Sequence, residues 1–172
     1  MSFSINISYI TDSDVELLIE KDKKGDWKTI QERGSNLAID NDMFMLSINH
    51  GKRPLGDKYA YTVLMNTTPE ATAEYVVNPT LEVLANTKKV QAVYDSKNDI
   101  VEAIFHTAGK IKLPSGRELK VNKGAVIILE NVSGEEVLTI ASHDYRDHSV
   151  KVTLGDKKYE YDITKRPKRC EL

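Results

Sequence analysis

The feature that most constrains this chain is the alternation of apolar and polar residues at every second position, while helical periodicity is scarce. In residues 150–154, Val and Leu alternate with Lys and Thr, and residues 159–163 repeat the pattern with Tyr and Ile. Gly155-Asp156 separates the two runs, which is a strong signal for a β-hairpin. This pattern predicts half-buried antiparallel strands.

Short runs of the same kind follow one another after Pro79. Turn-forming residues separate them, for example Pro114-Ser115-Gly116-Arg117 and Ser133-Gly134. Several short strands at this spacing predict an antiparallel sandwich. The predicted strands lie at residues 81–84, 90–94, 100–106, 111–113, 119–121, 125–130, 137–142, 150–154 and 159–163.

The first part of the chain carries fewer signals. Residues 42–48 read DMFMLSI, almost continuously apolar, which predicts a strand covered on both faces. Residues 59–65 alternate as a second strand, and residues 50–57 between them are rich in turn formers and should form an exposed connection. Residues 15–19 fit a helix or a strand equally, and the pattern does not decide between them.

One helix is predicted. Thr67 supplies a cap, Pro69 occupies the first turn and Glu70 is placed to close a capping box. Asn78-Pro79 ends the helix, because proline disfavours helical geometry in the residue before it. We therefore expect an all-β chain of antiparallel β-sandwich elements with one short helix, divided into residues 1–78 and 79–172.

Composition excludes several classes of function. The 172 residues are 40% hydrophobic and 29% charged, which is typical of a folded globular protein. The net charge of −2 argues against nucleic-acid binding, which normally requires a basic excess. No apolar run is long enough to cross a membrane, and the N-terminus MSFSINISYI does not resemble a signal peptide. The single cysteine, Cys170, excludes an intrachain disulfide.

Three groups of motifs follow one another in a distinctive order. They are Gly25-Asp26-Trp27-Lys28-Thr29-Ile30, then Asn49-His50-Gly51 followed by Tyr59-Ala60-Tyr61, then Val83-Leu84-Ala85-Asn86-Thr87 followed by Val90-Gln91-Ala92-Val93. Their order and spacing resemble the C-terminal β region of polysaccharide lyases of the hyaluronate/chondroitin/xanthan lyase family (family 8), chondroitinases in particular. The resemblance implies that residues 1–78 end the central β-sandwich domain and that residues 79–172 form the small C-terminal β-sandwich domain.

The resemblance also implies a function. Such lyases cleave uronic-acid-containing polysaccharides by β-elimination, and a helical domain upstream carries the chemistry. Because this chain has no pattern of long amphipathic helices, we expect no catalytic residue and no cofactor in it. The implied partners are an acidic polysaccharide of the glycosaminoglycan class and the missing N-terminal helical catalytic domain. The implied location is secreted or periplasmic.

Three residues are candidates for contact with carbohydrate: Trp27, His50 and Arg53. Residues 49–53, with the tyrosines downstream, contain every side-chain type that a uronate lyase needs, but consecutive residues at a strand end do not converge on one sugar ring. We therefore favour a structural turn there, with a sugar-contacting surface second and catalysis last. Trp27 is flanked by charged residues and is the aromatic that we place nearest the surface.

Two polar segments receive a simpler interpretation. Residues 143–148, HDYRDH, lack the spacing that lets two histidines share a metal, so we predict a polar loop and no metal site, with a calcium site as a minor alternative. Residues 165–169 are basic and are expected to form a solvated end. For the function of the chain, a non-catalytic part of a lyase comes first. An independent carbohydrate-binding module is the alternative, and an autonomous enzyme comes last.

Overall fold

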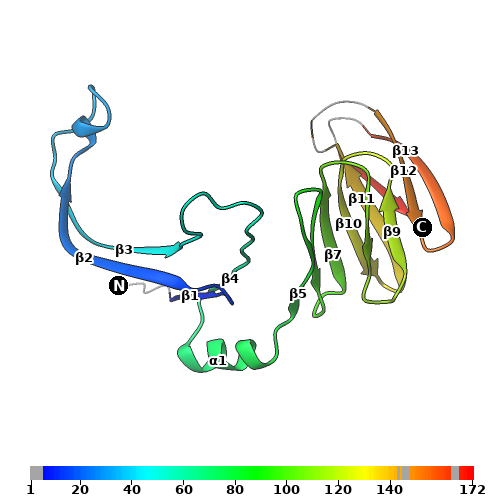
Figure 1. Ribbon diagram of the computed structural model, residues 1–172, viewed down its shortest axis with the longest axis horizontal. Helices are drawn as coiled ribbons and strands as arrows, with labels where there is room; N and C mark the ends of the chain where they lie inside the picture. The colour runs from blue at the N-terminus through cyan, green and yellow to red at the C-terminus, as the bar shows by residue number, and fades with distance from the viewer. Residues whose placement is uncertain (1–5, 143, 145–147, 164–166) are drawn as a thin grey trace. The chain divides into compact units, whose positions relative to one another are not determined.

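The computed structural model describes residues 6–142, 144, 148–163 and 167–172. The contacts within the chain form two compact units, residues 1–68 and residues 69–172. Figure 1 shows the elements of each unit. Antiparallel strands dominate both units, which confirms the predicted fold class.

The first unit consists of two small antiparallel sheets. One pairs β1 with β4, and the other pairs β2 with β3 in a long ribbon interrupted by a bulge between Glu20 and Lys23. Residues 15–19, whose sequence fits a helix and a strand equally, therefore belong to a strand. The elements are β1 (Ile7–Ile10), β2 (Val15–Gly25), the 3-10 turn η1 (Trp27–Thr29), β3 (Ile39–Ile48) and β4 (Thr62–Met65).

The apolar side chains of the β2–β3 ribbon are exposed. Phe44 and Met45, which are neighbours in β3 and therefore point to opposite faces, are 59% and 51% exposed. The prediction of a strand covered on both faces is wrong for this chain, because β2 and β3 pair only with each other among the described residues. The predicted strand over residues 59–65 begins only at Thr62.

The helix is confirmed as α1 (Pro69–Val77), which the contacts group with the second unit. It begins at its proline, whose fixed backbone angle suits the first helical turn. The last helical hydrogen bond runs from the amide of Asn78 to the carbonyl of Glu74 at 3.0 Å, just before Pro79. No helix in the described ranges of the chain is long and apolar enough to span a bilayer.

The second unit is a sandwich of two antiparallel sheets. The six-stranded sheet has the order β14-β11-β10-β7-β6-β5, and the four-stranded sheet has the order β13-β12-β9-β8. The strands are β5 (Leu81–Asn86), β6 (Val90–Asp95), β7 (Ile100–Phe105), β8 (Gly109–Lys112), β9 (Glu118–Val121), β10 (Ala125–Val132), β11 (Glu135–Ala141), β12 (His148–Leu154), β13 (Lys157–Ile163) and β14 (Lys168–Glu171).

The alternating residues of the sequence form the core between these sheets. In β7 and β9 every second side chain is buried, and the largest of them, Phe105 and Leu119, are completely shielded from solvent. Both sheets contribute to one continuous cluster, with Ile127 from the first and Val152 from the second. The period-two pattern thus reports the inward face of each strand.

Two tight turns fix the register of neighbouring strands. Val132 pairs with Glu135 across Ser133 and Gly134, whose φ angles of 55° and 92° are both positive. Positive φ at both central residues suits the right-handed twist of a two-residue hairpin, and glycine adopts it without strain. Leu154 likewise pairs with Lys157 across the predicted Gly155-Asp156 turn.

The C-terminal segment differs from its prediction. Lys168–Glu171 forms β14, which pairs with β11 so that Leu138 lies opposite Cys170. Lys168 and Arg169 are exposed, in keeping with a solvated end, but their backbone forms a strand that the sequence did not predict, because the edge of β11 offers it hydrogen bonds. Residues 164–166 lie outside the described residues, and so does most of the predicted polar loop 143–148.

Candidate functional site

The three predicted sugar-contacting residues all lie in the first unit. His50 follows β3 and is half-buried, Trp27 opens η1 and is 56% exposed, and Arg53 is an exposed loop residue with a φ of 57°. A positive φ is uncommon outside glycine, so the backbone of this loop adopts a left-handed conformation at Arg53. The structure brings these residues to separate places.

His50 belongs to an aromatic hollow of about 590 Å³. Its ring lies 5.9 Å from that of Tyr59, which in turn stacks at 6.3 Å on Tyr61 with 9° between the ring planes. Tyr9 from β1 and Phe44 from β3 meet edge to face at 6.4 Å and line the same hollow. This arrangement offers several aromatic faces to a ligand.

Local hydrogen bonds hold the rim of this aromatic hollow. The hydroxyl of Thr11 donates to the carbonyl of Ala60 at 2.7 Å, which ties the tyrosine segment to the end of β1. The Asn49 amide donates to Glu16 at 3.1 Å, and the Asn49 side-chain oxygen accepts from the amide of Gly51 at 2.8 Å. The segment 49–51 is therefore a hydrogen-bonded turn that also presents His50.

The aromatic hollow does not assemble the groups of a β-elimination. His50 Nδ1 lies 4.0 Å from Asp57 Oδ2, which is longer than a hydrogen bond. Lys52 and Arg53, the cations that follow His50 in the sequence, are not among the residues lining the hollow. Among the described residues, no group of three or more His, Cys, Asp or Glu side chains is arranged to hold a metal ion.

Trp27 lines a second, shallower hollow of about 410 Å³ together with Ile30 and Met43. The Asp26 carboxylate caps this turn by accepting from the amide of Thr29 at 2.8 Å. The hollow shares no lining residue with the one around His50.

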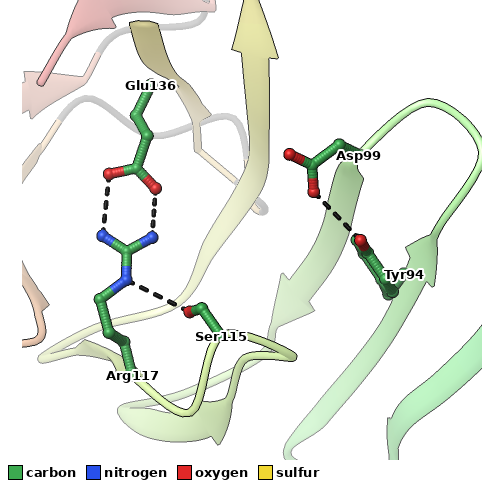
Figure 2. Close-up of polar contacts among 5 residues, drawn as sticks. All are labelled: Tyr94, Asp99, Ser115, Arg117 and Glu136. Carbon is green, nitrogen blue, oxygen red and sulfur yellow. Dashed lines mark hydrogen bonds and ion pairs between the residues drawn. The ribbon is translucent and has the colours of Figure 1, made fainter. Parts of the chain in front are cut away.

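A third hollow, of about 500 Å³, lies in the second unit at one end of the sandwich. We call it the sheet-end groove and define it by Tyr94, Asp99, Ser115, Arg117 and Glu136, which line it (Figure 2). Arg117 makes a two-pronged ion pair with Glu136, and Tyr94 donates to Asp99 at 3.1 Å. Sequence reasoning missed this groove because its residues come from strands and turns far apart in the chain.

The polar pairs of the sheet-end groove shift their own pKa values. The hydrogen bonds from Arg117 lower the pKa of Glu136, and the same bonds raise the pKa of Arg117. The hydrogen bond to Asp99 raises the pKa of the Tyr94 hydroxyl, with negative charge at Asp99 and Asp95 adding to the effect. At neutral pH the groove therefore holds a neutral tyrosine and the ion pair of Arg117 with Glu136, beside the carboxyl group of Asp99.

Comparison with known proteins identifies the family. The model of the polysaccharide lyase family 8 super-sandwich domain matches residues 2–76, and the model of the family 8 C-terminal beta-sandwich domain matches residues 82–144. The chain belongs to polysaccharide lyase family 8. The resemblance read from the sequence motifs is therefore confirmed.

Curated family 8 relatives are bacterial enzymes. The chain is 36% identical to Chondroitinase-AC of Pedobacter heparinus over 143 residues, which cover 82% of this chain and 20% of the relative. It is 32% identical to the Xanthan lyase of a Bacillus species over 87 residues, or 49% of this chain and 9% of that enzyme. The chain thus spans about a fifth or less of the length of these relatives.

Solved family 8 structures share its fold. A chondroitinase AC lyase, described in complexes with oligosaccharides, matches with a TM-score of 0.81 at 30% identity, covering 96% of this chain and 26% of that one. A variant of the Streptomyces coelicolor A3 chondroitin AC lyase matches with a TM-score of 0.83 at 20% identity, covering 95% of this chain and 24% of that one. The second likeness concerns the fold alone.

Proposed function

We propose that this chain is the C-terminal β region of a family 8 lyase that degrades uronic-acid-containing glycosaminoglycans of the chondroitin or hyaluronan type by β-elimination. In this proposal residues 1–78 complete the central β domain, and residues 79–172 form the terminal sandwich. The role of the chain is to support the enzyme and to help hold the polysaccharide. The similarity to Chondroitinase-AC supports the substrate class.

The exposed apolar surface of the β2–β3 ribbon is the observation that carries this proposal. Leu17 and Ile19 in β2 are 59% and 62% exposed, and Phe44 in β3 is equally prominent. Contiguous apolar surface of this kind marks an interaction site in a soluble protein. We assign it to the preceding strands of the same central β domain, because the matching family model describes a super-sandwich of which this ribbon is one part.

Proton transfer belongs elsewhere in this proposal. A β-elimination needs a group that neutralises the uronate, a base and an acid, all within reach of one sugar ring. The aromatic hollow offers His50 and three tyrosines without the cation, and α1 is the only α-helix in the described part of the chain. We therefore place these groups on a helical catalytic domain that precedes this chain. Export to the periplasm or the medium, where long polysaccharides are found, follows from the same proposal.

The direct test is an ultraviolet assay for unsaturated uronide, with the purified chain alone and with chondroitin and hyaluronan as substrates. We expect no product. Release of unsaturated oligosaccharides at an enzymatic rate contradicts the proposal and favours an autonomous enzyme. The coding sequence upstream of Met1 provides a second test, because the proposal requires amphipathic helices there.

An independent carbohydrate-binding module is the second candidate, and the stacked pair Tyr59 and Tyr61 favours it. Calorimetric titration with chondroitin oligosaccharides separates the two roles. A module loses its affinity in Tyr61→Ala, whereas a scaffold binds weakly before and after the substitution. Tyr75→Ala is the matched control, since Tyr75 of α1 lines none of the three hollows.

A further inference from the structure

We propose that the sheet-end groove binds an uncharged pyranose and discriminates against a uronate. The groove lies in the terminal sandwich of the second unit, whereas the three residues predicted from the sequence belong to the first unit. Its volume of about 500 Å³ is in the range of small-ligand sites. The inference deepens the proposed function, on which it rests for the choice of a carbohydrate as ligand.

Hydrogen-bonding groups line the groove from two directions. Figure 2 shows Arg117, Ser115 and Glu136 on one side and Tyr94 with Asp99 on the other. Glu136 and Ser115 accept from three of the five N–H donors of Arg117, which leaves two N–H groups for a ligand. Asp99 accepts from Tyr94 through one oxygen, and within the described residues its second oxygen is free to accept. Neighbouring sugar hydroxyls, which donate and accept, match this set.

The groove also has an apolar floor. Val101, Leu113 and Leu129, which are 5%, 4% and 6% exposed, reach it from the edge of the core. A pyranose ring carries C–H groups on one face and hydroxyls at its rim. A few placed polar groups around an apolar floor are the usual composition of a small-ligand site.

The charges of the groove select against an anion. Arg117 compensates Glu136, and Arg169 compensates Glu130 at 3.1 Å. Asp99 has no such cation among the residues that the structure describes. Asp95 also acts on the Tyr94 hydroxyl, but more weakly than Asp99, and Lys97 partly compensates it. The remaining field is therefore negative. A carboxylate or sulfate on the sugar meets repulsion, whereas a neutral hydroxymethyl group does not.

The test uses a matched pair of ligands with the full 172-residue chain. Methyl β-glucopyranoside and methyl β-glucuronide differ only in a hydroxymethyl group against a carboxylate. Amide chemical shifts are followed during titration by NMR. We expect the neutral glycoside to shift resonances of residues 94–101 and 113–117, and the glucuronide to bind about fivefold more weakly, as one like-charge contact near the surface implies.

Two substitutions separate the roles of charge and hydrogen bonding. Asp99→Asn removes the charge, keeps an acceptor and suits the positive φ of 54° at this position. It should bring the affinity ratio of the two ligands close to one. Tyr94→Phe should weaken both ligands. Asp162→Asn, an exposed carboxylate of β13 that does not line the groove, is the control and should leave the ratio unchanged.

Each other outcome overturns the inference. Absence of binding by the neutral glycoside does so, and so do equal affinities of the two ligands, an unchanged ratio in Asp99→Asn, or shifts confined to the aromatic hollow. Folding of each variant is checked by its thermal transition. Failure here leaves the proposed function open to its own test, because unsaturated uronide formation is measured independently.

Discussion

The guanidinium of Arg117 donates hydrogen bonds to both carboxylate oxygens of Glu136 and so joins the two sheets of the terminal sandwich (Figure 2). Arg117 follows the turn between β8 and β9 in the four-stranded sheet, and Glu136 lies in β11 of the six-stranded sheet. The hydrogen bond from Arg117 Nε to Ser115 at 3.2 Å holds the side chain in the required orientation. Paired planar groups of this kind are among the stronger ion pairs.

Glu136→Gln removes the ion pair with Arg117. At neutral pH this substitution should lower the free energy of unfolding by about 1 kcal/mol, a modest cost because both side chains keep partial access to water. The folded pKa of Glu136 is lowered from its usual 4.5. Its contribution is therefore present above pH 4.5 and is lost as the pH falls through the lower folded value. Urea unfolding at neutral and acidic pH measures this. Lys110→Ala breaks a more exposed pair and should cost less; an equal cost would contradict the argument.

Truncation of two phenylalanines should change the free energy of unfolding by very different amounts. Phe105 is completely buried, so Phe105→Ala should destabilise the second unit by about 3–5 kcal/mol. Phe44→Ala removes a side chain that is 59% exposed and should change the free energy of unfolding of the chain by less than about 0.5 kcal/mol. Denaturant unfolding of both variants, at a concentration low enough for the chain to be monomeric, checks the difference. A large loss in Phe44→Ala would show that the ribbon is covered in solution.

The exposed ribbon should cause self-association. Apolar side chains on unpaired strand edges favour pairing with another copy. We expect the apparent mass in size-exclusion chromatography to rise with concentration, and the substitutions Leu17→Lys and Phe44→Glu together to reduce this rise. The pair Lys97→Glu and Lys158→Glu, on exposed positions of the second unit, is the control. A monomer at every concentration would count against the surface as an interface.

Tyr161 should make the second unit sensitive to alkali. Its burial, together with Cys170, raises the pKa of the Tyr161 hydroxyl from 10.0 to about 12. The contribution of the protonated Tyr161 hydroxyl to the stability of the folded unit is therefore present below pH 10 and is lost as the pH rises through about 12. Tyr161→Phe should reduce the loss of stability over this range, as followed by thermal unfolding. Tyrosinate absorbance then assigns the effect, and an unchanged alkaline profile in the variant would contradict it.

The strands of the second unit follow from the sequence because each is buried on one face only. Phe105, Ile127 and Val152 occupy inward positions in runs where polar residues occupy the outward ones. Glycines with positive φ mark two of the turns, Gly134 and Gly155. Local pattern and local turn chemistry agree there, so the sequence predicts the elements within a few residues.

The first unit was less predictable. The short strand β1 carries no turn signal that separates it from its surroundings, and β2 fits two periodicities over residues 15–19. The apolar run of β3 predicts coverage on both faces, yet its side chains are exposed among the described residues. The sequence encodes that these residues form strands, whereas the burial of the strands depends on what packs against them.

The sequence by itself determined the family, the antiparallel strands of the sandwich and the single helix, because these depend on local periodicity and on the order of short motifs. The tertiary structure alone decided which polar residues meet. Tyr94 and Glu136 come from two separate strands of the six-stranded sheet, and Arg117 comes from a turn of the other sheet, yet all three line one groove. His50, Arg53 and Trp27 do not line a common hollow. The physical reason is that strand pairing brings together residues that are distant in the chain, and no local pattern records the resulting neighbours.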